Sequence, residues 1–596
     1  MSKLNIDQVT VMELFMNKKS DFLIPNYQRP YSWEESECQT LWDDIFAFAI
    51  PNDDCEAFDD SNDEYFLGPI VTFKNEENKK QEIIDGQQRL TTLMLLLRAF
   101  YAKFRNMQDK KSTSTRENIE KCIWKTNEFG EPNKNALKID SDVATDDHKE
   151  EFLSILKNGI IPDSVKRNRL TERVSNYVIN YEFFQKKIDN FLNDYPSYFP
   201  YLPTRILNNV ILLPIEAENQ DTALRIFSTL NDRGRPLSDS DIFKAQFYKF
   251  YSDLGKKDWF IKEWKELEAL SDKIFKPIYG TPMDELFSRY MYYERARQGI
   301  KSSTTEALRK FYDRDKYKLL KSESTFNNLK LLLSFWEDVT KQEVDRFTND
   351  VLRKLFVLNF APNSMWTNFV SVYFMHNKDE DGNLCNDSFS EFLTLITAFI
   401  WTYAITNPGV NALRTPVYAE MVNIVEGKKV TFNDFRFDEY HIRNSLDNFS
   451  FYNGRPITKS LLAWWAFNDS NQYLIDMDKV FEIEHIFARN RQTNERSLHN
   501  PKNLDSIGNK SLLEKKINIR ASDYRFEDKK KYYLGFTNSR GQEKGRTCIY
   551  ELEVIANTLT EFNESDIEQR KKKIIDGFVK FLNDNDLVSR SISLMN

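Results

Sequence analysis

The chain has 596 residues, of which 41% are hydrophobic and 14% aromatic. That content is ample for packed cores, and the length is too great for a single core, so we expect a globular protein of about three or four domains. The formal net charge of −8 argues against a general nucleic-acid binder. The charge is uneven, however, because residues 486–546 hold fifteen Lys and Arg against seven Asp and Glu.

Two further patterns argue against a membrane or disulfide-rich protein. The longest apolar run, residues 392–405, is interrupted by threonines and is shorter than the roughly 20 residues that span a bilayer. The chain does not open with a basic region followed by an apolar one. Its five cysteines form no C-x-x-C pair, so neither a disulfide framework nor a thiolate zinc site is expected. We expect a cytoplasmic protein with no membrane partner.

The first segment, residues 1–245, mixes strand and helix periodicity. We expect helices at 7–17, 34–50 and 87–104 and strands at 65–73, 81–84 and 210–215. Residues 101–205 are helix-rich and loop-like, which predicts a helical insertion. The mixture is typical of an α/β domain.

The rest of the chain is predicted to be mainly helical. Residues 246–450 repeat Trp, Phe and Tyr with a helical period, which favours a helical linker or scaffold domain. Residues 451–596 form a third domain, with a helix at 457–467, a strand that carries His485, a basic loop and further helices. The fold class expected for the whole chain is α+β and predominantly helical.

The run I-I-D-G-Q-Q-R-L-T-T passes from a strand directly into a helix. Such a helix start presents free backbone N–H groups and the positive end of the helix dipole, which favour a phosphate. The arginine would add a bidentate cation and the glutamines neutral donors. The residues that would surround the phosphate are Asp85, Gly86, Gln87, Gln88 and Arg89. A capped helix with Asp85 as its N-terminal acid explains the same pattern without a ligand.

The run I-P-N-Y-Q-R-P-Y-S-W interleaves aromatic rings with hydrogen-bonding side chains. This combination suits stacking on, and hydrogen bonding to, a base or a sugar. The residues concerned are Tyr27, Gln28, Arg29, Tyr31 and Trp33. A loop packed against the first strands explains the pattern equally well.

A third run, F-S-T-L-N-D-R-G-R-P-L-S, ends at Ser238. Ser238 with Asp241 predicts a capping box that starts the next helix. Asn231 and Arg233 lie in the turn before it and could close over a nucleotide. A turn plus a cap explains the serine and the glycine of this run, but not its two arginines.

The order Glu484, His485, Asn509, Asn518 is what a one-metal nuclease site needs. His485 lies in an apolar run and could deprotonate a water if its imidazole is neutral. A buried strand histidine is the simpler interpretation. The basic stretch 486–546 is correspondingly either a DNA-facing surface or a solvated helix face.

Taken together, these runs resemble one protein family. Residues 10–245 resemble the ParB-like, nucleotide-handling N-terminal domain of GmrSD-type restriction proteins, whose signatures I-P-x-Y-Q-R-x-Y-x-W, D-G-Q-Q-R-L-T-T-L and F-x-x-x-N-x-R-G-x-x-L-S occur here in order. The C-terminal third resembles the HNH nuclease domain of that family, a ββα-metal or His-Me finger fold, through E-H-I, G-N-x-x-L-L and the Asn and Lys positions that follow. The group includes the SspE and BrxU types of phage-defence effector.

The resemblance implies a nucleotide-regulated, metal-dependent DNA endonuclease of anti-phage defence, which cuts modified DNA in type IV restriction. It implies Mg²⁺ or Mn²⁺ as a cofactor. It also implies NTPase activity in the N-terminal domain, with GTP, UTP, CTP or ATP as the nucleoside triphosphate. The implied partners are the nucleotide and double-stranded DNA, in the form of modified phage DNA. Whether the protein forms a homo-oligomer stays open.

The resemblance also assigns roles to residues. His485 would be the general base, Asn509 would orient its imidazole or fix the loop, and Glu484 and Asn518 would hold the metal. The nucleotide would contact Asp85, Gly86, Gln87, Gln88, Arg89, Asn231 and Arg233. A ligand, either nucleotide or modified DNA, would be sensed by Tyr27, Gln28, Arg29, Tyr31 and Trp33. The DNA backbone would contact Lys515, Lys516, Lys529 and Lys530.

The sequence departs from the family pattern at two places, and two other functions stay open. Ala488 and Arg489 stand in the neighbourhood where the family commonly has a proline, and Asn518 stands where many HNH enzymes carry His. An amide oxygen still suits a hard cation. The alternative functions are a nuclease-inactive regulator that binds nucleotide and DNA, and an RNase-type toxin.

Overall fold

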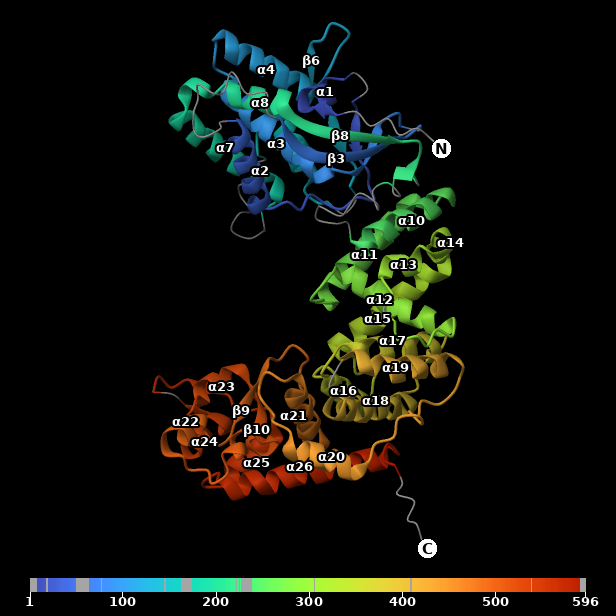
Figure 1. Ribbon diagram of the computed structural model, residues 1–596, viewed down its shortest axis with the longest axis vertical. Helices are drawn as coiled ribbons and strands as arrows, with labels where there is room; N and C mark the ends of the chain where they lie inside the picture. Colours follow the sequence, from blue (N-terminus) through green and yellow to red (C-terminus); the bar gives the residue numbers. More distant parts are fainter. Residues whose placement is uncertain are drawn as a thin grey trace. The chain divides into compact units, whose positions relative to one another are not determined.

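The computed structural model describes residues 8–589 apart from 18–19, 50–63, 77, 144–145, 162–173, 221, 224–225, 227–237, 305, 408–409 and 538. The chain divides into two compact units, residues 1–266 and 267–596. It is mainly helical with small sheets (Figure 1), so the expected α+β, mostly helical class is confirmed. The expected domain boundaries at 245 and 450 stay a prediction.

A six-stranded mixed sheet lies in the first unit. Its strand order is β1-β8-β3-β4-β2-β7, with β3 parallel to β8 and antiparallel to β4. The long strands β3 and β8 run side by side (Figure 1). The strands are β1 (Val9–Thr10), β2 (Phe22–Ile24), β3 (Tyr65–Lys74), β4 (Gln81–Asp85), β7 (Ile139–Ser141) and β8 (Val210–Ala217). The three strands expected from the sequence are all present.

Helix α3, Gln87–Phe104, is the core helix of the first unit. Almost every side chain of α3 is buried, because leucines and aromatic residues occupy all of its faces. The segment expected to be an insertion shares this core: Trp124 and Phe152 belong to the same hydrophobic cluster, and β7 pairs with β2. The other elements are α1 (Val11–Met16), α2 (Glu35–Ala49), α4 (Lys110–Ile123), β5 (Trp124–Thr126), β6 (Pro132–Leu137), α5 (Lys149–Asn158), α7 (Asn176–Asp194), η3 (Pro196–Tyr198), α8 (Tyr201–Asn209) and α10 (Asp239–Asp253). The boundary between the two units falls within α11 (Lys257–Ile274).

The second unit contains a long series of helices. They are α12 (Pro282–Arg297), α13 (Leu308–Tyr312), α14 (Arg314–Tyr317), η5 (Lys318–Leu320), α15 (Glu323–Lys341), α16 (Asn349–Leu358), α17 (Met365–Asn377), α18 (Asn386–Thr406), α19 (Val410–Val425), α20 (Glu439–Asn448) and α21 (Pro456–Asn468). Helix α18 is long and apolar enough to cross a membrane, but 61% of its most apolar window is buried in the structure. It contacts α16, α20 and α21, as a core helix does.

Short strands and helices complete the second unit. They are β9 (Phe481–His485), α22 (Arg489–Glu495), η6 (Pro501–Asp505), η7 (Ile507–Asn509), β10 (Lys510–Glu514), α23 (Lys515–Ala521), α24 (Phe526–Leu534), β11 (Phe536–Thr537), β12 (Glu543–Lys544), α25 (Tyr550–Thr558) and α26 (Glu564–Asp584). Strands β9 and β10 form an antiparallel ribbon. Helix α26 contacts η7, the turn that leads into β10. The ribbon and the helix after it carry the candidate catalytic residues.

Candidate functional site

The candidate nuclease residues lie on the ribbon of β9 and β10, on the turn η7 before β10 and on the helix α23 after it. His485 is the last residue of β9 and lies opposite Lys510 in the register of the ribbon. Because side chains alternate between the two faces of a strand, Glu484 and His485 leave the ribbon on opposite faces. Asn518 lies in α23, which contacts both β9 and β10.

His485 is buried, with 6% of its surface exposed. Its Nε2 lies 3.6 Å from Oδ1 of Asp505, and the same oxygen accepts a 2.9 Å hydrogen bond from Lys510 Nζ. Burial lowers the pKa of His485 to about 4, helped by the positive charges of Lys510 and Arg489 and opposed by Asp505. The imidazole is therefore neutral at neutral pH, as a general base requires.

Sequence reasoning missed Asp505 and Lys510 as neighbours of His485. Asp505 ends a short 3-10 helix, an element without a periodicity that could mark it. Lys510 is fully buried and also donates a 2.8 Å hydrogen bond to Oδ1 of Asn453. Its position opposite His485 depends on the register of the ribbon, which no pattern in the sequence specifies.

Glu484 is buried on the other face of the ribbon, with 3% exposure. Its Oε1 accepts hydrogen bonds from Lys529 Nζ at 2.7 Å and from the Tyr533 hydroxyl at 2.5 Å. Burial raises the pKa of Glu484, and the Lys529 ammonium opposes this rise. Lys529 Nζ also donates to the carbonyl of His485 at 2.6 Å.

The structure corrects the expected role of Lys529 and separates the four predicted DNA-contacting lysines. Lys529 is fully buried and donates to Glu484 and to the His485 carbonyl, and an ammonium buried in this way does not reach a DNA phosphate. Lys530 is half-buried and donates to the carbonyl of Leu559 at 2.7 Å. Lys515 and Lys516 are exposed at the start of α23, so their predicted contact with DNA remains open.

Asn509 fixes the loop after His485. It is fully buried, accepts a 2.7 Å hydrogen bond from Phe487 N, and donates to the carbonyls of Phe487 and Leu504. Of the two roles expected for Asn509, this geometry favours fixing the loop.

The glycine before Asn509 is required by close packing. A Cβ on Gly508 would lie 2.0 Å from the carbonyl oxygen of Ile567 in α26. Arg570, also in α26, donates to the carbonyls of Ile507, Gly508 and Lys510. The last long helix therefore holds the turn that leads into β10.

The side-chain oxygens of Glu484 and Asn518 are of the kind that a hard divalent cation prefers. In the part of the chain that the structure describes, Glu484 Oε2 accepts no hydrogen bond, and the half-buried side-chain amide of Asn518 makes none. The carboxylate of Asp523 lies close enough to raise the pKa of Glu484 further. No group of three or more His, Cys, Asp or Glu side chains among the described residues could hold a metal by itself. Mg²⁺ in particular is often held by one or two carboxylates, with waters and substrate phosphates completing its shell.

In the first unit, the D-G-Q-Q-R run forms the expected passage from β4 into α3. Gly86 has φ +91°, and a Cβ there would lie 3.0 Å from Ile70. Arg89 donates to the carbonyl of Pro69 and lies 3.7 Å from Asp85. Burial raises the pKa of Asp85, and Arg89 opposes this rise. The run therefore joins the sheet to the core helix, whether or not it binds a ligand.

The glutamines of this run bind the I-P-N-Y-Q-R-P-Y-S-W loop. Gln88 Oε1 accepts from the backbone N–H groups of Ser32 and Trp33, and its Nε2 donates to Pro30. Gln87 donates to Gln28 at 3.0 Å. A phosphate could engage these amides only by replacing bonds that hold the loop, so their nucleotide role stays a prediction.

The aromatic residues of the loop are also engaged within the protein. Tyr31 is buried, bonds Thr92 at 2.7 Å and stacks on Tyr177. The Tyr27 hydroxyl donates to Glu82 at 3.3 Å, and Trp33 is partly buried against the core. The packed-loop interpretation therefore accounts for these contacts. Arg29 lies near enough to Asp85 to lower the pKa of that carboxyl.

Of the third sequence run, the structure describes only the last residue, Ser238. Asn231 and Arg233 lie outside the described residues, so their predicted place beside a nucleotide stays a prediction. The predicted capping box is confirmed: Ser238 accepts from Asp241 N, and Asp241 accepts from Ser238 N.

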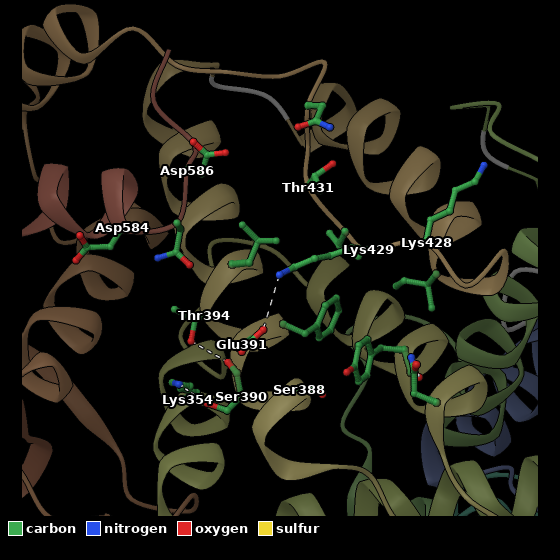
Figure 2. A pocket seen from close by; sticks show the side chains of 18 of the residues that line it. Lys354, Ser388, Ser390, Glu391, Thr394, Lys428, Lys429, Thr431, Asp584 and Asp586 are labelled. Carbon is green, nitrogen blue, oxygen red and sulfur yellow. Dashed lines mark hydrogen bonds and ion pairs between the residues drawn. The ribbon is translucent and has the colours of Figure 1, made fainter. Parts of the chain in front are cut away.

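A cavity of about 900 Å³ lies in the second unit (Figure 2), and its lining includes none of the candidate catalytic residues. Its walls include side chains of α17 and α18 and of the loop 427–436. The cations that line it each lie within 4 Å of a carboxylate oxygen, in the pairs Lys354–Asp350, Lys428–Glu426, Lys429–Glu391 and Arg436–Asp586. Because these charges are compensated, the cavity gives no sign of preferring an anion such as a nucleotide.

Two family models match the chain. The model of the GmrSD restriction endonuclease N-terminal domain matches residues 11–248, and the model of the GmrSD restriction endonuclease C-terminal domain matches residues 437–576. The first match includes the sheet and the sequence runs of the first unit, and the second includes β9, β10 and α23. A search of curated proteins returned no significant match.

Proposed function

Since the chain belongs to the GmrSD family of restriction endonucleases, we propose that it is a cytoplasmic, metal-dependent DNA endonuclease of anti-phage defence that cuts modified DNA. The observation that carries this proposal is His485: a buried histidine with a lowered pKa, at the end of the first strand of a ββα arrangement. We assign this arrangement to the HNH, or His-Me finger, class.

His485 would act as the general base. With Nε2 directed toward Asp505, Nδ1 is the nitrogen left to accept a proton from the attacking water. The 3.6 Å between Nε2 and Asp505 Oδ1 is beyond hydrogen-bond distance, so Asp505 would act through its negative charge, which stabilises the imidazolium that forms. Lys510 holds Asp505 in place through its 2.9 Å hydrogen bond.

Glu484 and Asn518 would hold one Mg²⁺ or Mn²⁺. Their carboxylate and amide oxygens are hard donors, which these cations prefer. Bound there, the cation would stabilise charge on the scissile phosphate and the leaving oxygen. The exposed Lys515 and Lys516 at the start of α23 would contact the DNA backbone.

The first unit would regulate the nuclease through a nucleoside triphosphate. We assign to it a ParB-like fold and NTP hydrolysis, with Asp85 and Arg89 nearest the phosphates. The N-terminus of α3 supports this assignment, because it offers backbone N–H groups and a dipole that favour anions. Which nucleotide is used can be decided by a binding screen of wild type and Arg89→Ala. Equal binding by both proteins would contradict the assignment.

The proposed function can be tested with the purified full chain. We would incubate it with plain, methylated, glucosylated and phosphorothioate DNA and with RNA, each with and without Mg²⁺ and nucleoside triphosphates, and separate the products on gels. We expect Mg²⁺-dependent cutting of modified DNA that EDTA abolishes and that His485→Ala lacks. Cutting of RNA alone would overturn the proposal in favour of a toxin, and binding of DNA without any cutting would overturn it in favour of a regulator.

A further inference from the structure

The buried lysine of the nuclease site contacts both candidate catalytic residues. Lys529 Nζ donates to Glu484 Oε1 at 2.7 Å and to the backbone carbonyl of His485 at 2.6 Å. Its side chain is 1% exposed, and that of Glu484 is 4% exposed. An ammonium buried to this degree neither meets DNA nor exchanges readily with solvent, so its role concerns the residues that it touches.

A tyrosine completes the contacts on the same carboxylate oxygen. The Tyr533 hydroxyl donates to Glu484 Oε1 at 2.5 Å, and Tyr533 is fully buried. Lys529 and Tyr533 are four residues apart in α24, so they project from one face of that helix. Two side chains on one face of α24 therefore hydrogen-bond the same oxygen of Glu484.

The other oxygen of Glu484, Oε2, differs from Oε1 in its hydrogen bonding. Oε2 accepts no hydrogen bond from the described residues, although the side chain is almost wholly buried. Oε2 is not among the buried side-chain atoms that lack a partner, so this oxygen keeps contact with solvent and is open to a ligand. A carboxylate that binds a metal through one oxygen commonly has its other oxygen hydrogen-bonded by neighbouring residues.

We propose that Lys529 and Tyr533 are positioning residues that hold Glu484 Oε1 and so present Oε2 as a single-oxygen ligand to the divalent cation. This inference rests on the proposed metal-dependent nuclease. Lys529 has a second effect, because its charge compensates Glu484 whenever the cation is absent, and a buried carboxylate without a partner is strongly unfavourable. Its bond to the His485 carbonyl ties the end of β9 to the same helix face.

The tyrosine offers the sharper test, because Tyr533→Phe removes one hydroxyl and leaves Lys529 in place. Mn²⁺ binding to the full chain would be followed by the electron paramagnetic resonance signal of free Mn²⁺, for wild type, Glu484→Gln, Tyr533→Phe and Lys529→Met. Matched controls are Tyr532→Phe and Lys531→Met, since Tyr532 and Lys531 lie in the same helix and neither touches Glu484. Cleavage would be measured across Mn²⁺ concentrations with the same proteins.

We expect Glu484→Gln to lose the site. Tyr533→Phe should raise the half-saturating Mn²⁺ concentration about 10- to 100-fold, as is typical when a hydrogen-bond partner of a metal ligand is removed. At saturating Mn²⁺ its cleavage rate should return close to that of wild type, whereas a merely structural defect would leave the rate low at every Mn²⁺ concentration. The two controls should bind Mn²⁺ as wild type does.

The outcomes separate this inference from the proposed function. If Glu484→Gln loses the site while Tyr533→Phe binds Mn²⁺ as tightly as wild type, the positioning role is wrong and the metal site stands. If Tyr532→Phe weakens binding as much as Tyr533→Phe, the positioning role is also wrong. If Glu484→Gln binds Mn²⁺ unchanged, the metal assignment fails and this inference fails with it. Should Lys529→Met not fold, Tyr533→Phe alone still decides.

Discussion

The two units use the polar residues of their sequence runs in different ways. In the first unit, Gln28, Gln87 and Gln88 are buried and hydrogen-bond one another or the backbone. In the second unit, Glu484 and Asn518 keep oxygen atoms that bond nothing among the described residues. Buried polar groups with all their bonds made stabilise a fold, and those with bonds left over can serve a ligand. We therefore expect substitutions to affect stability in the first unit and chemistry in the second.

The largest expected effect is on catalysis. Replacing His485 with Ala should lower the DNA cleavage rate by at least about 100-fold, the usual loss when a general base is removed. The fold should survive, because the His485 ring makes no hydrogen bond at Nε2. Cleavage assays together with circular dichroism would check both parts. A folded variant that cuts at nearly the wild-type rate would remove His485 from the site.

The Lys529→Met variant is an exception to this expectation, because it should lower the stability of the second unit. Removing the ammonium leaves Glu484 buried without its partner, which costs about 3–5 kcal/mol of unfolding free energy. Denaturant unfolding would measure this loss. The double variant Lys529→Met with Glu484→Gln should regain part of it. Exposed Lys531→Met should change stability by less than about 0.5 kcal/mol, and equal losses in the two single variants would contradict the buried pair.

Asp505→Asn should show that the carboxylate beside Nε2, which sequence reasoning missed, supports the base through its charge. We expect a loss in cleavage rate of about 10- to 100-fold, as for other residues that hold a catalytic histidine. The protein should remain folded, since Asp505 is only partly buried and Lys510 keeps its bond to Asn453. Rates measured at saturating DNA would test this, and an unchanged rate would leave Asp505 without a role.

Gln88→Ala tests the expectation that substitutions in the first unit lower stability. It leaves the N–H groups of Ser32 and Trp33 without their acceptor, which should cost about 1–3 kcal/mol. Thermal unfolding of the variant would be compared with Gln39→Ala, an exposed glutamine of α2. A Gln88→Ala protein as stable as wild type, but unable to bind nucleotide, would show that the amide serves a ligand instead.

The smallest effect is expected from the exposed lysines of α23. Substituting Lys515 or Lys516 with Gln should lower the salt dependence of DNA binding, the slope of log K against log salt, by about 1 for each lysine. Fluorescence anisotropy with labelled DNA at several salt concentrations would measure the slope. Lys530→Gln, whose Nζ bonds Leu559, is the comparison, and equal slopes for the three variants would argue against a DNA contact by α23.

The sequence predicted secondary-structure elements more successfully than contacts between side chains. The strands at 65–73, 81–84 and 210–215 and the helix at 87–104 follow from periodicity, and the capping box of Ser238 from two residues three apart. The residues around His485 could not be found in this way. Lys510 reaches it through the register of β9 with β10, and Asp505 through the short helix η6 that precedes β10. Lys529 looks like one cation in a basic stretch until the fold buries it. Burial and register are tertiary properties, so a local pattern carries little information about them.

The packing of Gly508 and Arg570 has a consequence for how the protein is made. The turn before β10 is held by Ile567 and Arg570 of α26, a helix that follows His485 by almost 80 residues in the chain. A ribosome therefore synthesises His485, Asn509 and Asn518 well before the helix that locks their turn in place. An unfinished chain that ends before residue 564 carries the nuclease residues without this support. We therefore expect the turn before β10 to be held in place only once α26 has been synthesised.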